Sequence, residues 1–342
     1  MPVLYLTEQG STLRKEGELF LVTKDDQELQ KVQAVKVEQV VVLGNINLTT
    51  PVINYLLQEG IDCVFCNSYG KYHGRLLSNE SKYGLLRQSQ METISDTHRK
   101  LAIAKEIVRG KFLNQRTLLM RYRRENDISS LDTAIRTFED GLNKLERVAD
   151  IGTLLGVEGN TAARYFEAFK ELLKKDMGFN ARVRRPPTDP VNSMLSFGYT
   201  LLAYNMQSAV SIVGLDPFLG CLHVTEYSRP SLVLDLMEEF RSIIVDSVVL
   251  RIVNNNILTE ADFERPAPST GSEQGEQGRM VALTQAAIKK FVHHYEERVQ
   301  TVIQHPVTGH QVNYRRCFEL QARQVGRVFL RQEATYKPFL VK

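Results

Sequence analysis

The first 88 residues alternate between short apolar runs and turn-forming or charged residues. Apolar runs rich in Val, Leu and Tyr lie at residues 3–7, 12–23, 29–35 and 37–45. Short runs separated by glycine or charged residues are typical of strands and hairpins. One helix is expected at about 51–59, followed by strands at 61–66 and 71–77. The pattern therefore predicts a small β-rich domain over residues 1–88.

After residue 88 the pattern becomes helical. Residues 91–124 contain almost no helix breaker, and most of the remaining chain is also periodic at helical spacing. The expected fold class is therefore α+β, with the small N-terminal β-rich domain followed by a larger all-α C-terminal domain over 89–342. Residues 264–278 interrupt this pattern with Pro, Gly, Ser and charged residues. Such a composition buries too little apolar surface to offset the entropy of ordering, so a mobile loop is expected there.

Two acidic residues and a histidine stand close together in the second half of the chain. His223 lies in a short connection, and Pro230 and Ser231 indicate the start of a helix, with proline in the first turn and serine accepting a bond from a free amide. Asp235 and Glu238 are three residues apart, so they share a face of this helix. Neighbouring carboxylates repel, and either solvent or a cation must compensate. The alternatives are the polar stripe of an amphipathic helix for the carboxylates and a core or loop position for the histidine.

A further carboxylate lies between two glycines at the expected start of another helix. Gly156 and Gly159 flank Glu158 closely and leave room for another chain to approach. A divalent ion is one explanation for a carboxylate in this setting. The alternative is an exposed glutamate that is favoured by the positive end of the helix dipole.

Composition and charge exclude several classes of protein. The 342 residues carry a formal net charge of only +3, so any nucleic-acid contact must come from local clusters of basic residues. The sequence has no apolar run of membrane-spanning length and no secretory signal, which predicts a cytoplasmic protein without membrane contact. It also has no glycine-rich phosphate loop, so an ATP-driven function has no support. The four cysteines give no reason to expect disulfides, and Cys63 and Cys66 lie in an expected buried strand.

Basic residues cluster at three places, and the first and third clusters have an alternative to DNA contact. The first ends a long helix and is typical of a solvated face. The third repeats every four residues along an expected helix face, which suits either a DNA backbone or a protein partner. Four histidines, His293, His294, His305 and His310, have no acidic group beside them in this interpretation and are expected to be structural or exposed. The clusters are Arg121, Arg123 and Arg124; Arg182, Arg184 and Arg185; and Arg323, Arg327 and Arg331.

Four motifs, in a fixed order along the chain, indicate a resemblance to a known family. They read GVEGNTAARYF, RRPPTDPVNSMLSFGYTLL, GLDPFLGCLH and RPSLVLDLMEEFR along the chain. In this order and with these separations, the sequence resembles the CRISPR-associated integrase of the universal spacer-acquisition pair, of a type I system. The resemblance covers essentially the whole chain.

The resemblance implies a metal site and a set of DNA contacts. In that family a glutamate, a histidine and a further acidic residue hold a divalent metal, and these positions match Glu158, His223 and Glu238. Asp235 matches a second acidic position, a close supporter or alternative ligand. The oxygen-rich ligand set implies Mg²⁺ or Mn²⁺. The implied DNA-binding residues are Arg164, Arg184, Arg185, Asn192, Arg323 and Arg327.

The implied activity is DNA integration in adaptive antiviral defence. The 3′ hydroxyl of a short DNA duplex would attack a phosphodiester at the edge of a CRISPR repeat, a transesterification that needs no high-energy cofactor. The resemblance also implies a homodimer, formed through the β-rich domain, that flanks the small second protein of the pair. A metal-dependent, structure-selective nuclease acting mainly on branched DNA is the alternative, since it would use the same residues.

Overall fold

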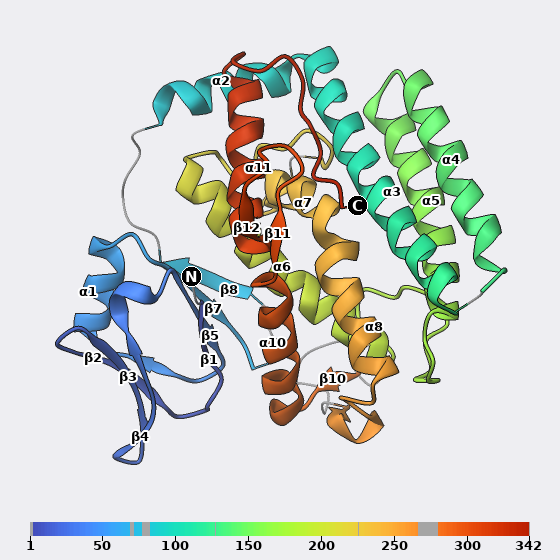
Figure 1. Ribbon diagram of the computed structural model, residues 1–342. Coiled ribbons are helices and arrows are strands. Elements are labelled where there is room, and N and C mark those ends of the chain that lie inside the picture. Colours follow the sequence, from blue (N-terminus) through green and yellow to red (C-terminus); the bar gives the residue numbers. More distant parts are fainter. Residues whose placement is uncertain are drawn as a thin grey trace. The chain divides into compact units, whose positions relative to one another are not determined.

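The computed structural model describes residues 3–68, 72–76, 83–126, 128–224, 226–265 and 280–341. The chain forms two compact units, Met1–Ser81 and Lys82–Lys342 (Figure 1). The expected boundary at residue 88 falls inside the first helix of the second unit, α2 (Gly84–Ser95). Most of the loop expected at 264–278 lies outside the described residues. Within the described residues, no helix combines the length and apolarity needed to cross a membrane.

The first unit is β-rich, as the alternating pattern predicted, and its described residues form two four-stranded sheets and one α-helix. In one sheet the order is β1-β5-β7-β8, with the first three strands parallel and β8 antiparallel to β7. In the other the order is β4-β3-β2-β6. The elements are β1 (Val3–Leu6), β2 (Thr12–Glu16), β3 (Leu19–Lys24), β4 (Gln27–Gln33), β5 (Gln39–Leu43), β6 (Asn47–Leu48), α1 (Thr50–Gln58), β7 (Asp62–Cys66) and β8 (Tyr72–Leu76).

The core of the first unit is formed by apolar side chains of both sheets and of α1. Phe20 on β3, Val40 on β5 and Leu56 on α1 are completely buried in it. Cys63 belongs to the same core, and Cys66 is also buried on β7, so both thiols are structural, as expected from the sequence. Removal of this apolar surface from water is the main force that stabilises the unit.

The second unit is mainly helical, which confirms the expected fold class. Two short antiparallel strand pairs, β9 with β10 and β11 with β12, were not expected in an all-α domain. The long elements are α3 (Thr97–Asn126), α4 (Leu131–Arg147), α5 (Ile151–Glu171), α6 (Pro190–Val213), α7 (Ser231–Met237), α8 (Ser247–Asn254), α10 (Gln285–Val299) and α11 (Tyr314–Phe329). The short strands are β9 (Phe263–Glu264), β10 (Ala282–Leu283), β11 (Val302–Gln304) and β12 (Gln311–Asn313).

The helix expected to run without interruption over residues 91–124 is broken at Asp96. This residue has an extended conformation, and its carboxylate accepts hydrogen bonds from the amides of His98 and Arg99. An aspartate that satisfies free amides in this way starts a new helix. The long helix therefore divides into α2 and α3.

Helices α3, α4 and α5 lie side by side in Figure 1. Their contact is formed by aromatic rings packed edge to face, with Phe138 of α4 between Phe112 of α3 and Tyr165 of α5. Gly141 permits this approach, because a Cβ atom there would lie 3.0 Å from the Phe112 ring and 3.1 Å from the Thr161 hydroxyl. The packing fixes α5 against the central part of α3.

The helix that follows residue 230 changes its geometry along its length. It begins as α7, continues as a 3-10 turn over Glu238–Phe240 and a π-helical segment over Arg241–Asp246, and ends as α8. Irregular turns of this kind are frequent at functional sites. The Ser231 hydroxyl donates to the Val224 carbonyl at 2.9 Å, and the residue at the N-cap of the helix is Pro230, without a side-chain capping bond. Pro230 precedes the first turn instead of lying in it.

Candidate active site

Two of the predicted ligands converge on one buried ammonium group. Lys111 of α3 pairs with Oε1 of Glu158 on α5, and its Nζ atom lies 2.7 Å from Oε2 of Glu238. The side chains of Lys111 and Glu238 are only 6% and 5% exposed, whereas that of Glu158 is 19% exposed. The three elements thus enclose a positive charge between two carboxylates.

Glu158 reaches this position from the middle of its helix. The expectation that it stands at a helix start is wrong, because α5 begins at Ile151 and is capped by Asp150, whose carboxylate accepts from the Thr153 amide at 2.8 Å. The helix dipole therefore does not explain its placement. Gly156 and Gly159 lie on an open side of α5, where an added Cβ would meet no described atom within 4 Å.

His223 is held in place by Asp235. Its Nδ1 atom lies 2.8 Å from Oδ1 of Asp235, and its Nε2 atom lies 3.9 Å from Oε1 of Glu238. A histidine that donates from Nδ1 to a carboxylate keeps the lone pair of Nε2 available as a ligand. The imidazole therefore directs its second nitrogen toward the carboxylate of Glu238.

Asp235 is fully buried, and both of its oxygens are already used. They accept hydrogen bonds from the amides of Cys221, Leu222 and His223, at 2.5 to 2.9 Å. Gly220 makes this close approach possible, because a Cβ there would lie 2.7 Å from Oδ2 of Asp235. The interpretation of Asp235 as an alternative ligand does not fit this arrangement, whereas its role as a close supporter of His223 does.

Arg241 supports the same carboxylate from the π-helical segment. Its Nε atom lies 2.9 Å from Oε1 of Glu238, and its guanidinium stacks over the Tyr199 ring at 4.6 Å. Tyr199 and Tyr165 each donate a hydrogen bond of 2.6 Å to Asp246. Arg241 is thus fixed both by an aromatic face and by a buried polar network.

The charges of the site keep its carboxylate ionised. Burial disfavours the anion of Glu238, but Arg241, Lys111 and His223 outweigh burial and lower its pKa to about 2. Burial also opposes the charged form of Lys111, but Glu238 and Glu158 hold its pKa above the usual value. Burial raises the pKa of Asp246 to about 6. Glu238 therefore presents an ionised carboxylate at neutral pH.

Comparison with known proteins identifies the family. The model of the family described as CRISPR associated protein Cas1 matches residues 4–297. The chain belongs to the Cas1 family. It is 37% identical over 342 residues to "CRISPR-associated endonuclease Cas1 3" of Thermus thermophilus, a match that covers 99% of this chain and 97% of the relative. The family resemblance seen in the sequence is thereby confirmed.

Solved structures share this Cas1 fold. A chain of the structure described as "Casposase bound to integration product" is similar with a TM-score of 0.84 and 23% identity, over 98% of this chain and 93% of that chain. A chain of a "Cas6-RT-Cas1--Cas2 complex" has a TM-score of 0.82 and 22% identity, over 100% of this chain and 36% of that chain. At these identities the comparison shows the shared fold.

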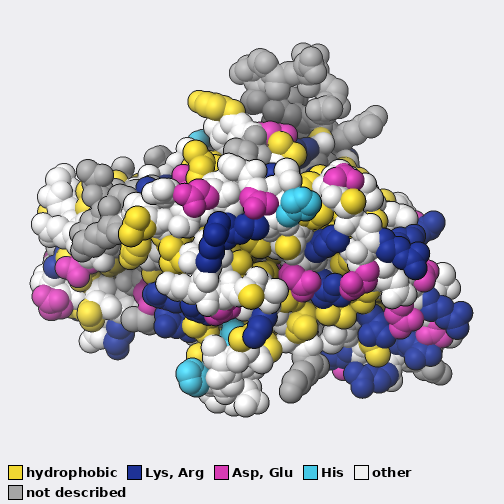
Figure 2. All heavy atoms as spheres, turned by 90° about the horizontal axis from the view of Figure 1, so that it is seen from above, with side chains coloured by type: hydrophobic (Ala, Val, Ile, Leu, Met, Phe, Trp, Pro, Cys, Tyr) yellow, Lys and Arg dark blue, Asp and Glu magenta, His cyan; other side chains and the backbone are white. Residues whose placement is uncertain are grey.

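The implied DNA-binding arginines of this Cas1 protein lie at the surface. Arg184 and Arg185 are exposed in the segment between α5 and α6. Arg164 pairs with Glu167 at 2.8 Å, and Arg323 of α11 pairs with Glu319 at 2.7 Å. On the face seen in Figure 2, Lys and Arg side chains gather toward one edge and are interspersed with Asp and Glu.

Asn192 is not available for a DNA contact. It is completely buried, it accepts from Arg182 and from the Val183 amide, and it donates to Asp189 and to the Ala181 carbonyl. The implied role of Asn192 is therefore wrong, and the residue instead fixes the segment that carries Arg184 and Arg185.

The third basic cluster is not one continuous helix face. Helix α11 ends at Phe329, and Arg331 follows with a positive φ of 59°, outside the helical repeat. Arg327 lies within the helix and pairs with Glu333 at 2.5 Å. Only Arg323 and Arg327 therefore share the expected face.

The histidines outside the site differ in their surroundings. Contrary to expectation, His293 and His294 have an acidic neighbour, since Glu297 lies one helical turn further on α10. This exposed group has metal-binding side chains, but Glu297 also pairs with Arg251 at 3.1 Å. His305 is buried and accepts two backbone hydrogen bonds, so its expected structural role is confirmed.

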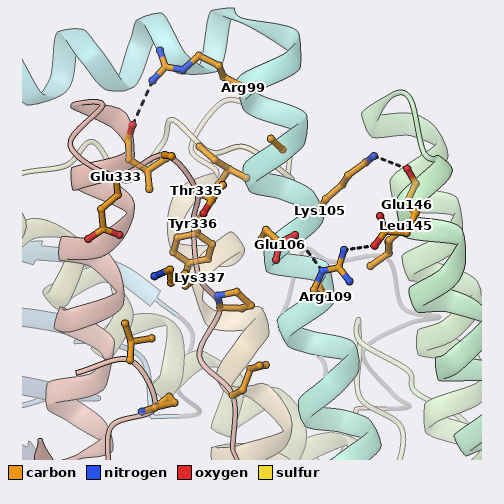
Figure 3. Close-up of a pocket in the computed structure, with 18 of the residues that line it drawn as sticks. Arg99, Lys105, Glu106, Arg109, Leu145, Glu146, Glu333, Thr335, Tyr336 and Lys337 are labelled. Carbon is orange, nitrogen blue, oxygen red and sulfur yellow. Dashed lines mark hydrogen bonds and ion pairs between the residues drawn. The ribbon is translucent and has the colours of Figure 1, made fainter. Parts of the chain in front are cut away.

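A cavity of about 810 Å³ lies beside α3, apart from the converging carboxylates. Figure 3 shows Lys105, Glu106 and Arg109 of α3 on one side, with Glu146 opposite and Tyr336 in the C-terminal segment. Arg109 pairs with both glutamates, at 3.1 and 2.9 Å. Glu158, His223 and Glu238 are not among the residues that line this cavity.

Sequence analysis missed Lys111 and Arg241. Lys111 occupies the buried stripe of α3, together with Ala104, Ile107 and Val108. A lysine in such a stripe requires a buried partner, because an unpaired charge there is very costly. The position of this lysine was the signal in the sequence, whereas its partners depend on how α5 and the 3-10 turn Glu238–Phe240 pack against α3.

Proposed function

We propose that this chain is a divalent-metal-dependent DNA integrase that inserts short DNA into a CRISPR array. The observation that carries the proposal is the convergence of Glu158, Glu238 and Nε2 of His223 around one enclosed positive charge. The proposal agrees with membership in a family whose relative in Thermus thermophilus is named an endonuclease. The fold shared with a casposase bound to an integration product is in keeping with it.

The side chains present fit a hard divalent cation. Two carboxylates and one neutral imidazole form an oxygen-rich donor set, which suits Mg²⁺ or Mn²⁺ better than a soft metal. The low pKa of Glu238 keeps one donor anionic. Glu158, His223 and Glu238 would hold the ion, which when bound would neutralise charge on the phosphodiester and activate the attacking hydroxyl.

Neighbouring side chains position His223 and Glu238 and keep Glu238 ionised. Asp235 fixes the tautomer of His223, and Arg241 together with Tyr199 fixes Glu238. Pre-positioned groups act on the transition state without reorganising during the reaction. The side chain of Glu158 is 19% exposed, which leaves part of it accessible to a DNA backbone.

The substrates and partners follow from the chemistry proposed. A 3′ hydroxyl of the incoming duplex would attack a phosphodiester of the CRISPR repeat, and one phosphodiester would replace another. Arg164, Arg184, Arg185, Arg323 and Arg327 are exposed or partly exposed cations suited to phosphate. We further propose a homodimer, formed through the first unit, that flanks a small second protein. A chain of similar fold occurs in a structure described as a "Cas6-RT-Cas1--Cas2 complex".

Strand transfer tests the proposal. The protein, with its small partner, is given a duplex with free 3′ hydroxyls, a repeat-containing plasmid and Mn²⁺. Wild type is expected to join the DNAs, and a chelator or the change His223→Ala should abolish joining. His310→Ala, at an exposed histidine outside the site, is the matched control and should retain activity.

The other outcomes have definite meanings. Cleavage without joining would favour the structure-selective nuclease. Equal joining by wild type and His223→Ala would overturn the proposed site. DNA binding, measured in parallel, should stay nearly unchanged in Glu158→Ala and Glu238→Ala, because it depends mainly on basic side chains.

A further inference from the structure

The ammonium group of Lys111 is the cation that the two carboxylates enclose. It lies on the buried stripe of α3, reaches Glu158 on α5, and lies 2.7 Å from Glu238. Two carboxylates so near one another would repel strongly in a buried setting without a positive charge between them. Lys111 therefore provides the charge balance that allows the site to fold.

A divalent ion held by the same carboxylates would stand close to this ammonium. Glu158 and Glu238 are balanced by Lys111 and Arg241, two anions against two cations. A further cation between the carboxylates would face Lys111 at short range, where repulsion in a buried site is large. Both cations cannot occupy the same space.

The two basic residues differ in their freedom to move. Arg241 is stacked on Tyr199 and lies in an irregular, fully buried part of its helix. Lysine has four rotatable methylene groups and a compact charge. Lys111 shares an oxygen-lined position with both carboxylates, whereas Arg241 contacts Glu238 alone among them. Of the two basic residues, Lys111 is therefore the one whose charged group can move away from the carboxylates.

We propose that Lys111 is a built-in counter-ion that holds the position of the divalent ion between Glu158 and Glu238, and that metal binding displaces its ammonium. This inference rests on the proposed metal-dependent function. It assigns Lys111 a positioning role: it keeps the two ligands together before the metal arrives and sets the affinity with which the metal binds.

Metal binding without DNA tests the inference. Mn²⁺ affinity is measured by calorimetry and by the electron paramagnetic resonance of free Mn²⁺, for wild type and Lys111→Met. The variant is expected to bind Mn²⁺ about tenfold or more tightly, because no ammonium then lies between the two carboxylates and repels the metal ion. Without metal its Tm should fall below that of wild type, and saturating Mn²⁺ should raise its Tm by more than it raises that of wild type.

Matched variants separate displacement from a general charge effect. Arg241→Gln also removes one positive charge beside Glu238, but not from the position between the carboxylates. A gain in affinity for Lys111→Met that is no larger than for Arg241→Gln would overturn the inference, as would an unchanged or weaker affinity. If Lys111→Met does not fold, Lys111→Gln keeps hydrogen-bond donors without the charge and carries the same expectation.

Failure of this inference is distinguishable from failure of the proposed function. If wild type binds Mn²⁺ and joins DNA while neither Lys111 variant gains affinity, only the role of Lys111 is overturned. If neither wild type nor any variant binds Mn²⁺, the proposed metal-dependent function fails as well, and the inference falls with it.

Discussion

Individual side chains around the site illustrate how burial sets the ionisation of acidic residues. Glu238 and Asp246 are both buried, yet the pKa of Glu238 falls to about 2 and that of Asp246 rises to about 6. Glu238 has cations in direct contact, whereas the nearest partners of Asp246 are two tyrosine hydroxyls. Neutral donors compensate burial less well than charges do. Buried acidic residues therefore differ in charge: Glu238 is an anion, whereas Asp246 is a neutral acid below about pH 6.

Asp246 should make stability depend on pH. The pKa of Asp246 is raised in the folded state, so the protonated form stabilises the fold relative to the ionised form. This contribution of Asp246 to the free energy of unfolding is fully present below the ordinary pKa of 3.8 and is lost as the pH rises through about 6. Asp246→Asn stays neutral, so its free energy of unfolding should rise relative to that of wild type by about 2 kcal/mol between pH 4 and 7. Urea unfolding at a series of pH values measures this difference.

A control with the opposite shift is available for that experiment. Backbone hydrogen bonding by Thr153 lowers the pKa of the exposed Asp150 from 3.8, so its contribution to stability is fully present above this ordinary value and is lost only as the pH falls below it. Asp150→Asn should therefore differ from wild type by a nearly constant amount over the pH range in which Asp246 titrates. A flat difference for Asp246→Asn as well would show that Asp246 is ionised throughout this range.

At the scale of elements, the glycines of two adjacent helices have opposite surroundings. Gly110 of α3 lies against the C-terminal segment, and a Cβ there would be 2.5 Å from Cβ of Pro338 and 3.1 Å from Cγ of Glu239. Gly156 of α5 faces open space. Gly110 is thus tightly packed, whereas Gly156 has open space beside it.

Alanine at these two positions should have opposite effects on stability. Gly110→Ala forces the C-terminal segment away and is expected to cost about 1–3 kcal/mol, the usual range for overpacking. Gly156→Ala reduces the entropy lost by a helix-interior glycine and should stabilise the protein by about 0.5–1 kcal/mol. Thermal and urea unfolding of both variants measures the signs. Stabilisation by Gly110→Ala would contradict the tight contact with Pro338.

At the scale of the whole molecule, DNA affinity depends on where the charges lie, because the net charge is only +3. Many surface arginines already pair with glutamates, as Arg164 does with Glu167 and Arg323 with Glu319. Surface ion pairs are weak, so phosphate can compete for such arginines. Arg184 and Arg185 are exposed on a segment fixed by the buried Asn192, which makes them the preferred candidates for phosphate contact.

The salt dependence of DNA binding tests this assignment. Arg184→Ala with Arg185→Ala should weaken binding and reduce the slope of log affinity against log salt by about 2, since each phosphate contact releases about one counterion. Fluorescence anisotropy with a labelled duplex at several salt concentrations gives the slope. The control Lys31→Ala with Lys36→Ala removes the same charge from exposed positions of the first unit. Equal slopes in both double variants would remove Arg184 and Arg185 from the DNA surface.

The sequence by itself determined the α+β class, the strands of the first unit, the long helices of the second and membership in the family. These features follow from local periodicity and from motifs that lie along the chain, so neighbouring residues carry the signal. It also indicated Glu158, His223 and Glu238 through the motifs. The sequence could not show that Asn192 is buried or that the helix ends before Arg331. Burial and helix ends depend on how the elements pack.

Only the tertiary structure decided which groups meet. Lys111 precedes Glu158 by 47 residues, and Asp246 lies 81 residues beyond Tyr165, so no local pattern joins them. The packing of α3 against α5 and the irregular helix after Ser231 bring these side chains together. The ammonium of Lys111 would be unfavourable on the apolar face of α3 alone, because a buried charge without a partner is costly. It becomes favourable when Glu158 and Glu238, on two other elements, pair with it. The pairing energy therefore arises only in the folded protein and not within any one segment of the chain.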